Sequence, residues 1–160
     1  MRFFICFGIN RQFRSLEFAQ RLLWSEGRAI LKVGIIGGGR VGSRLAASLR
    51  EAGLLAGITA ASEQHSAQLA QQFGVPVTDN AKLWQAADVL LLTVPDRLIG
   101  TVAEELAQSL TPAAKVVLHV SGSVGLEPLA PLTQLGAHVG SLHPLQSFAG
   151  GNTQLAGVYM

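Results

Sequence analysis

The sequence has 160 residues, of which 49% are hydrophobic and only 14% are charged. That length suffices for one ordinary domain with a buried core, and the composition excludes a disordered chain and a coiled coil. The net charge is +2, but residues 1–32 hold six basic and two acidic residues, which leaves −2 for the other 128. A basic excess confined to one end does not suit a nucleic-acid-binding surface, so we expect no nucleic-acid partner.

Residues 1–31 are expected to form a basic N-terminal extension outside the domain. The longest apolar run there, Phe3–Ile9, is too short for a membrane span of about 20 residues. An organellar transit peptide and a translated upstream extension that adds nothing to the domain are both compatible with its arginines. The single cysteine, Cys6, excludes an intrachain disulfide and a thiolate zinc site. We therefore expect a soluble, cytoplasmic protein with no membrane partner.

From Lys32 onward, short apolar runs alternate with helical patterns, which is typical of βαβ units and a parallel sheet buried on both faces. The expected strands are residues 32–36, 57–61, 75–77, 89–94, 115–120 and 137–142. The expected helices are residues 41–52, 66–73, 80–86, 98–110 and 126–135. Right-handed crossovers between six such strands predict an α/β fold with a doubly wound parallel sheet of order 3-2-1-4-5-6.

Polar residues and glycines mark the ends of these helices. Asp79 and Asp96 occupy positions where a side chain would accept hydrogen bonds from the first amides of the following helices. Gly53, Gly74 and Gly136 follow helical runs, where a left-handed backbone conformation is needed. These five residues support the predicted helix boundaries.

A glycine motif carries the most specific functional signal. Gly37, Gly39 and Gly42 form G-x-G-x-x-G between the first strand and the first helix. Gly37 permits a tight turn, a Cβ at Gly39 would block a pyrophosphate from the backbone, and Gly42 lets the helix pack closely. The free amides and the helix dipole would meet the phosphate charge. We expect a dinucleotide to contact Gly37, Gly38, Gly39, Arg40, Val41 and Gly42.

The simplest alternative to a dinucleotide site is a glycine-rich turn that binds no ligand. S-adenosylmethionine is a second alternative. Loops that bind S-adenosylmethionine usually carry an acid just before the first glycine, whereas Ile35 and Ile36 stand here. An acid about 20 residues beyond the loop would hold the adenosine ribose and favour NAD. Ser62 occupies that position and could donate to a 2′-phosphate, while Glu63 beside it would favour NAD. We expect NADP, with NAD possible.

A second set of motifs shows a resemblance to a known group of enzymes. Asp79-Asn80 and the run Ala86–Asp96 resemble a block found in pyrroline-5-carboxylate reductase and in relatives of prephenate dehydrogenase. In that block the loop after the fourth strand lies along the cofactor. The resemblance implies that Val94, Pro95 and Asp96 contact the cofactor.

His119–Ser123 and Gly140–Phe148 are most similar to a family of NADP-dependent oxidoreductases whose substrates are unassigned. Its members join a Rossmann-like N-terminal domain to a helical C-terminal domain of unknown function. The resemblance implies a dinucleotide-binding domain over residues 32–154 and a further strand beginning at 155–160. It also implies that this chain is a fragment. The missing part would be the helical domain, which forms the homodimer and closes the substrate pocket in that family. Relatives often have Ser-Arg where this chain has Ser62-Glu63, which weakens the NADP assignment.

The carboxyl ends of the last three strands supply the catalytic candidates, because ligands bind there in open α/β sheets. We expect His143 to act as acid or base or to orient a small-molecule substrate, and Ser121 to polarise it. His119 lies in an apolar strand and is expected to be a hydrogen-bonded core residue. No histidine or carboxylate pair has metal-ligand spacing, so no metal is expected.

The expected reaction is hydride transfer to or from a small imine, carbonyl or hydroxy substrate. A non-catalytic nucleotide-binding module or a redox sensor subunit is the alternative, because a fold does not settle a function.

Overall fold

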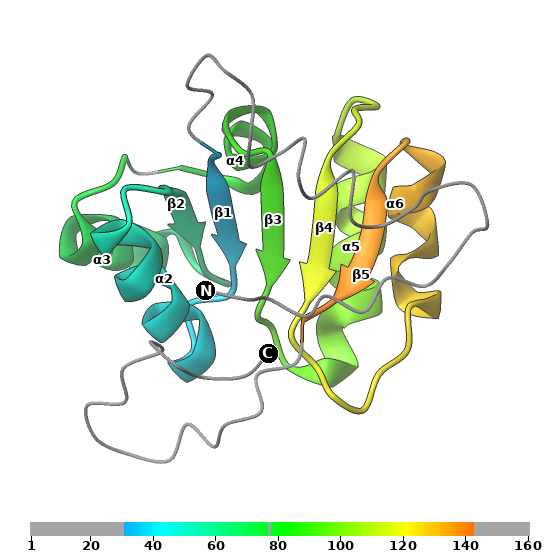
Figure 1. Cartoon of the computed structure of the whole chain (residues 1–160), viewed down its shortest axis with the longest axis horizontal. Helices are drawn as coiled ribbons and strands as arrows, with labels where there is room; N and C mark the ends of the chain where they lie inside the picture. The colour runs from blue at the N-terminus through cyan, green and yellow to red at the C-terminus, as the bar shows by residue number, and fades with distance from the viewer. Residues whose placement is uncertain (1–30, 77, 143–160) are drawn as a thin grey trace.

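A parallel sheet forms the centre of the protein. The computed structural model describes residues 31–76 and 78–142. Within them five strands pair in the order β2-β1-β3-β4-β5, and every pairing is parallel (Figure 1). The strands are β1 (Val33–Ile36), β2 (Leu55–Thr59), β3 (Val89–Leu92), β4 (Val116–His119) and β5 (His138–Ser141). The predicted doubly wound α/β fold is confirmed.

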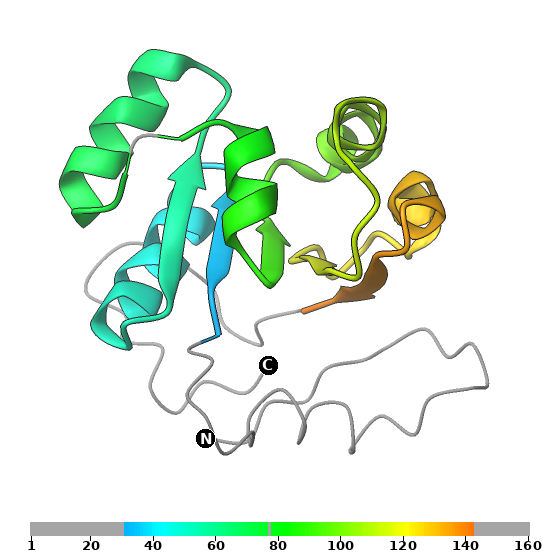
Figure 2. The ribbon, with the colours of Figure 1, turned by 90° about the horizontal axis from the view of Figure 1, so that it is seen from above.

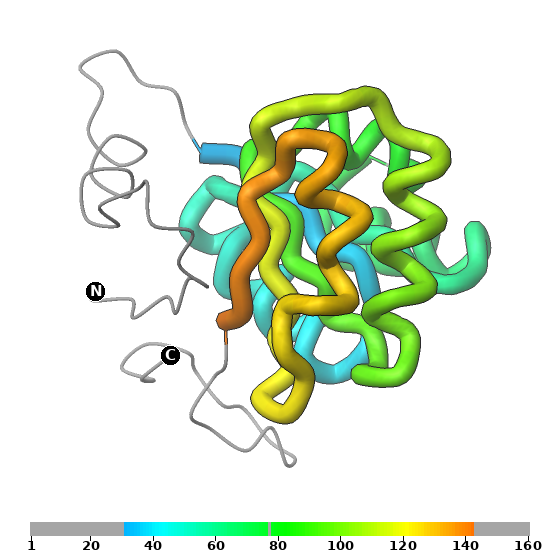
Figure 3. The backbone as a smooth tube through the Cα atoms, turned by 90° about the vertical axis from the view of Figure 1, so that its right-hand side faces the viewer, coloured from blue at the N-terminus to red at the C-terminus, as the bar shows by residue number. Residues whose placement is uncertain are grey.

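Helices cover the sheet on two faces. They are α2 (Arg40–Glu51), α3 (Glu63–Phe73), α4 (Asn80–Ala86), α5 (Ile99–Ser109) and α6 (Ala130–Gln134), with 3-10 turns η1 (Asp96–Leu98) and η2 (Glu127–Leu129). The chain moves outward in one direction from β1 to β2 and in the other from β3 to β5, so right-handed crossovers place the connecting helices on opposite faces. Figure 2 shows α2 on one face and α5 and α6 on the other, and Figure 3 views the sheet from its β5 edge.

The core consists of two apolar layers separated by the sheet. Successive residues of a strand point to opposite faces, so Ile35 packs with Leu45 of α2 while Ile36 packs with Ile99 of α5 in the other layer. All four residues of β1 are buried. Burial on both sides explains why the strands read as unbroken apolar runs instead of alternating patterns.

The strand predicted at residues 75–77 is not formed, since Val75 and Pro76 lie outside any strand and residue 77 lies outside the described residues. Gly74 ends α3 in the left-handed conformation, with φ 62°, and the N–H of Val75 donates to the carbonyl of Ala70 at 3.0 Å. Pro76 has no N–H to give to a strand pairing. The described residues between α3 and α4 therefore add no strand to the sheet, and the predicted order loses its outermost member.

The helix-end predictions are confirmed at four of the five positions. Asp79 caps α4 by accepting the N–H of Lys82 at 2.8 Å. Gly53, Gly74 and Gly136 all have positive φ. The exception is Asp96, at the start of η1, where no side chain caps the turn. No helix in the described part of the chain combines the length and the apolar character needed to cross a bilayer.

Candidate functional site

The loops that follow β1, β3 and β4 meet at one edge of the sheet, because the carboxyl ends of parallel strands lie together (Figure 1). The glycine motif follows β1 and turns directly into α2. Gly37 has φ +120°, a conformation that other residues rarely adopt, and its N–H donates to the carbonyl of Thr59 at 2.9 Å. A Cβ on Gly37 would stand 2.7 Å from the carbonyl carbon of Thr93. The first glycine is therefore required by the turn itself.

Gly42 is required by helix packing. A Cβ on Gly42 would overlap the carbonyl oxygen of Gly37 and stand 2.6 Å from Thr93 Oγ1. The first turn of α2 thus lies directly against the glycine turn, as the sequence predicts. Because no side chain fits between them, the start of α2 is held beside the end of β1.

Gly39 differs from both, because nothing in residues 31–76 and 78–142 requires glycine there. Its backbone has φ −73° and ψ −170°, which any residue can adopt, and a Cβ on it would have no heavy atom within 4 Å. Gly39 is the N-cap of α2, and no side chain caps this helix. The amides of the first turn, which include those of Arg40 and Val41, have no partner within an α-helix. The position of a Cβ on the neighbouring Gly39 is open.

Thr93, which no sequence motif singles out, holds the glycine turn in place. Its Oγ1 donates to the carbonyl of Gly37 at 2.6 Å, and its N–H donates to the carbonyl of Ile36 at 2.9 Å. The prediction placed Thr93 inside a strand over residues 89–94, whereas β3 ends at Leu92. A hydroxyl at the end of an otherwise apolar run was the available signal.

The end of β2 lies two residues earlier than predicted, and Ala60 and Ala61 follow it. No carboxylate therefore stands directly at the end of this strand. Ser62 caps α3, its Oγ accepting the N–H of His65 at 3.2 Å. Capping uses an oxygen lone pair and not the hydroxyl hydrogen. Glu63 is the first residue of α3 and is exposed.

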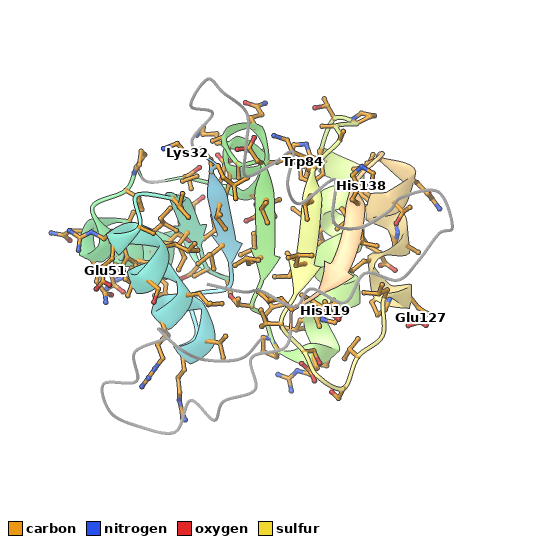
Figure 4. The ribbon with its side chains drawn as sticks, viewed as in Figure 1. Lys32, Glu51, Trp84, His119, Glu127 and His138 are labelled. Carbon is orange, nitrogen blue, oxygen red and sulfur yellow. The ribbon has the colours of Figure 1, made fainter. Side chains whose placement is uncertain are left out.

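His119 is the last residue of β4 (Figure 4), and its side chain is fully buried. Its Nε2 lies 3.0 Å from the carbonyl oxygen of Gly125, and its Nδ1 accepts the N–H of Ser121 at 3.2 Å. These partners suit a neutral ring that carries its proton on Nε2. The prediction that His119 is a satisfied core residue is confirmed.

Hydrogen bonds connect the β4 loop to the β3 loop. Ser121 is buried, and its Oγ accepts the N–H groups of Ser123 and Val124, each at 3.2 Å. Ser121 Oγ also lies 3.3 Å from Ser123 Oγ, which donates to Asp96 Oδ2 at 2.7 Å. These hydrogen bonds, that from Ser123 first and one from Ser121 second, hold the pKa of Asp96 below its ordinary value.

The prediction that Asp96 caps a helix is wrong. Asp96 is the first residue of η1, whose N-cap is Pro95, and no side chain caps this turn. The carboxylate accepts the Ser123 hydroxyl instead of a backbone amide. Val94 is half-buried and Pro95 is exposed at the same edge.

The remaining predicted site residue, His143, lies outside the described residues, so its approach to Ser121 stays a prediction. Within residues 31–76 and 78–142, no three histidine, cysteine or acidic side chains gather in a group that could hold a metal ion.

Comparison with known proteins identifies the domain. A model of the Rossmann-like domain matches residues 25–144. The chain belongs to the Rossmann-like domain family. One curated relative, a D-apionate oxidoisomerase of Cupriavidus necator, is 30% identical over 118 residues, which are 71% of this chain and 42% of that protein.

Solved structures of several proteins share the fold of this domain. A pyrroline-5-carboxylate reductase from Coxiella burnetii aligns at a TM-score of 0.63 and 22% identity, over 75% of this chain and 46% of that one. The Synechocystis arogenate dehydrogenase aligns at a TM-score of 0.61 and 27% identity, over 75% of this chain and 43% of that one. A reductive aminase from Aspergillus terreus, solved with NADPH, aligns at a TM-score of 0.58 and 15% identity, over 74% of this chain and 42% of that one. The chain spans less than half the length of each of these proteins.

Proposed function

We propose that this chain is the cofactor-binding domain of an NAD(P)-dependent oxidoreductase. The reaction is hydride transfer to or from a small imine, carbonyl or hydroxy substrate. The observation that carries the proposal is the open space at Gly39. Gly37 and Gly42 serve the fold of the chain, whereas a glycine at position 39 has no purpose within the described protein. A diphosphate resting against the backbone would give it one.

The residues of the glycine loop fit such a cofactor. The start of α2 offers backbone amides and the positive end of a 12-residue helix to the diphosphate. Arg40 is exposed at that start and would add a cationic contact. Val94, Pro95 and Asp96 would line the continuation of the site along the edge of the sheet. When bound, the nicotinamide cofactor supplies the hydride chemistry, and the protein orients it.

NADP is proposed as the cofactor, with NAD as the second choice. The absence of a carboxylate directly after β2 within the described residues supports NADP, because an acid there would repel a 2′-phosphate. Ser62 keeps a hydroxyl hydrogen that could be donated to that phosphate. The reductive aminase solved with NADPH supports the same choice at the level of the fold.

Ser121 and His143 are proposed to serve the substrate. Ser121 lies in the loop after β4, where a nicotinamide would end in this fold. To polarise a substrate, its hydroxyl would turn its hydrogen away from Ser123 and Asp96. His143 would supply or accept a proton, which is the common role of an imidazole near neutral pH. We also propose that the protein works in the cytoplasm as a homodimer, which a helical C-terminal domain would form.

Calorimetric titration with NADPH, NADH and FAD tests nucleotide binding. We expect NADPH to bind at least tenfold more tightly than NADH. A tenfold preference for NADH would overturn the NADP assignment, and absence of heat with all three would overturn the proposed function. Turnover is tested by NADPH oxidation with a panel of imines and 2-oxo acids, where binding without turnover would indicate a nucleotide-binding module.

A further inference from the structure

The hydrogen bonds between the β3 and β4 loops have a defined donor direction. The two lone pairs of Ser121 Oγ accept backbone N–H groups, so its own hydrogen remains to be donated. Ser123 uses its hydrogen on Asp96 Oδ2, which leaves the hydrogen of Ser121 for the 3.3 Å contact with Ser123 Oγ or for the carboxylate itself. Both hydroxyls therefore direct their hydrogens toward the exposed carboxylate of Asp96.

His119, at the buried end of this chain of hydrogen bonds, is the weakest of the influences on the carboxylate of Asp96. The partners of His119, the carbonyl of Gly125 and the N–H of Ser121, suit the uncharged ring. Within residues 31–76 and 78–142, the structure pairs no lysine or arginine with Asp96, and the serine hydroxyls are the main groups that favour its charged form. Asp96 is thus a fixed negative charge, oriented by Ser123, at the edge where β3 and β4 end.

We propose that Asp96 is a specificity-determining residue whose carboxylate binds a cationic nitrogen of the substrate, an iminium or an ammonium group. This inference rests on the proposed function, which places the substrate at this edge of the sheet. Ser123 occupies Oδ2, so Oδ1 is the atom that would face the substrate. An oxygen that bears charge and only accepts hydrogen bonds favours a positively charged N–H donor, and it gives no hydrogen bond to a neutral carbonyl oxygen.

A pair of probes of equal ring size tests the inference. Pyrrolidinium and tetrahydrofuran are titrated into the 160-residue chain, with and without saturating NADP⁺, and dissociation constants are read from NMR shifts. Removing one partner of an exposed ion pair weakens binding by about fivefold, and by about tenfold where the contact is also charge-assisted. We expect Asp96→Asn to weaken the binding of pyrrolidinium by about five- to tenfold and to leave the binding of tetrahydrofuran unchanged.

Two further variants make the result specific to Asp96. Glu104→Gln removes the same charge from an exposed position on α5 and should leave both probes unaffected. Ser123→Ala should weaken pyrrolidinium by a smaller factor and raise the carboxyl pKa of Asp96, read from its side-chain carbon shift. That shift distinguishes orientation of the carboxylate by Ser123 from a general effect on the loop.

Several results would overturn the inference. The wild type could bind the two probes with equal affinity. Alternatively, Asp96→Asn could lose no more affinity for pyrrolidinium than Glu104→Gln does. A wild type that binds no nucleotide would refute the proposed function. The titrations without NADP⁺ would then still decide whether Asp96 selects the cation.

Discussion

Replacing Gly39 by alanine should separate ligand binding from protein stability. A Cβ at this position has no heavy atom of the described residues within 4 Å, and the backbone conformation suits an L residue. The only expected cost is the poorer N-cap preference of alanine compared with glycine. The free energy of unfolding should therefore stay within about 1 kcal/mol of the wild type.

The effect on nucleotide binding should be much larger. The new methyl group would stand where a diphosphate oxygen is expected to approach the amides at the start of α2. A hydrogen bond to a charged group contributes about 1.5–3 kcal/mol. Loss of one such bond would weaken binding by about 10- to 150-fold. The structure thus predicts a protein that folds normally and binds NADPH poorly.

Gly42→Ala is the matched control, because there the same methyl group would overlap the carbonyl oxygen of Gly37. That variant should lose at least about 1–3 kcal/mol of stability through overpacking, together with nucleotide binding. Chemical denaturation followed by circular dichroism measures stability, and calorimetry with NADPH measures affinity. A Gly39→Ala protein that binds NADPH as tightly as the wild type would refute the placement of the diphosphate.

Three other variants test the supporting structure. Thr93→Val leaves the carbonyl of Gly37 without its hydroxyl donor and should cost about 1–3 kcal/mol in urea unfolding, so an unchanged midpoint would contradict its role in holding the turn. Trp84→Phe removes the 3.1 Å hydrogen bond from Nε1 to the carbonyl of Thr111 and should cost about 1 kcal/mol, again by urea unfolding. Because the pKa of Asp96 is lowered in the folded protein, its carboxylate stabilises the fold at pH values above its ordinary pKa of 3.8. This stabilisation is lost as the pH falls through the lower pKa of the folded state. Asp96→Asn should flatten the acid limb of the stability profile, whereas an identical profile would remove Asp96 as a contributor.

The glycine motif and the strands were predictable because each depends on local sequence. A strand buried on both faces must be apolar throughout, and a left-handed turn strongly favours glycine. The same reasoning predicted a strand at residues 75–77 from two valines. The proline between them and the left-handed end of α3 at Gly74 prevented it. A run of three residues was too short to reveal that conflict.

The contacts between loops were not predictable from the same patterns. Asp96 stands before a helical run, as a capping residue would, yet it accepts a hydrogen bond from Ser123, 27 positions later. Thr93 similarly holds the carbonyl of Gly37, 56 positions earlier. Both pairings depend on how closely neighbouring strands bring their ends together. Local sequence gives that distance only after the strand order and the strand ends are known.

Backbone amide shifts on titration with NADPH test the central claim most directly. A diphosphate at the start of α2 predicts the largest changes at Gly38, Gly39, Arg40 and Val41, with smaller ones in the loop of Ser121. The surface formed by the amino ends of the strands should stay unchanged. The account would be contradicted by a titration in which the glycine loop is unaffected, whether NADPH binds elsewhere or does not bind.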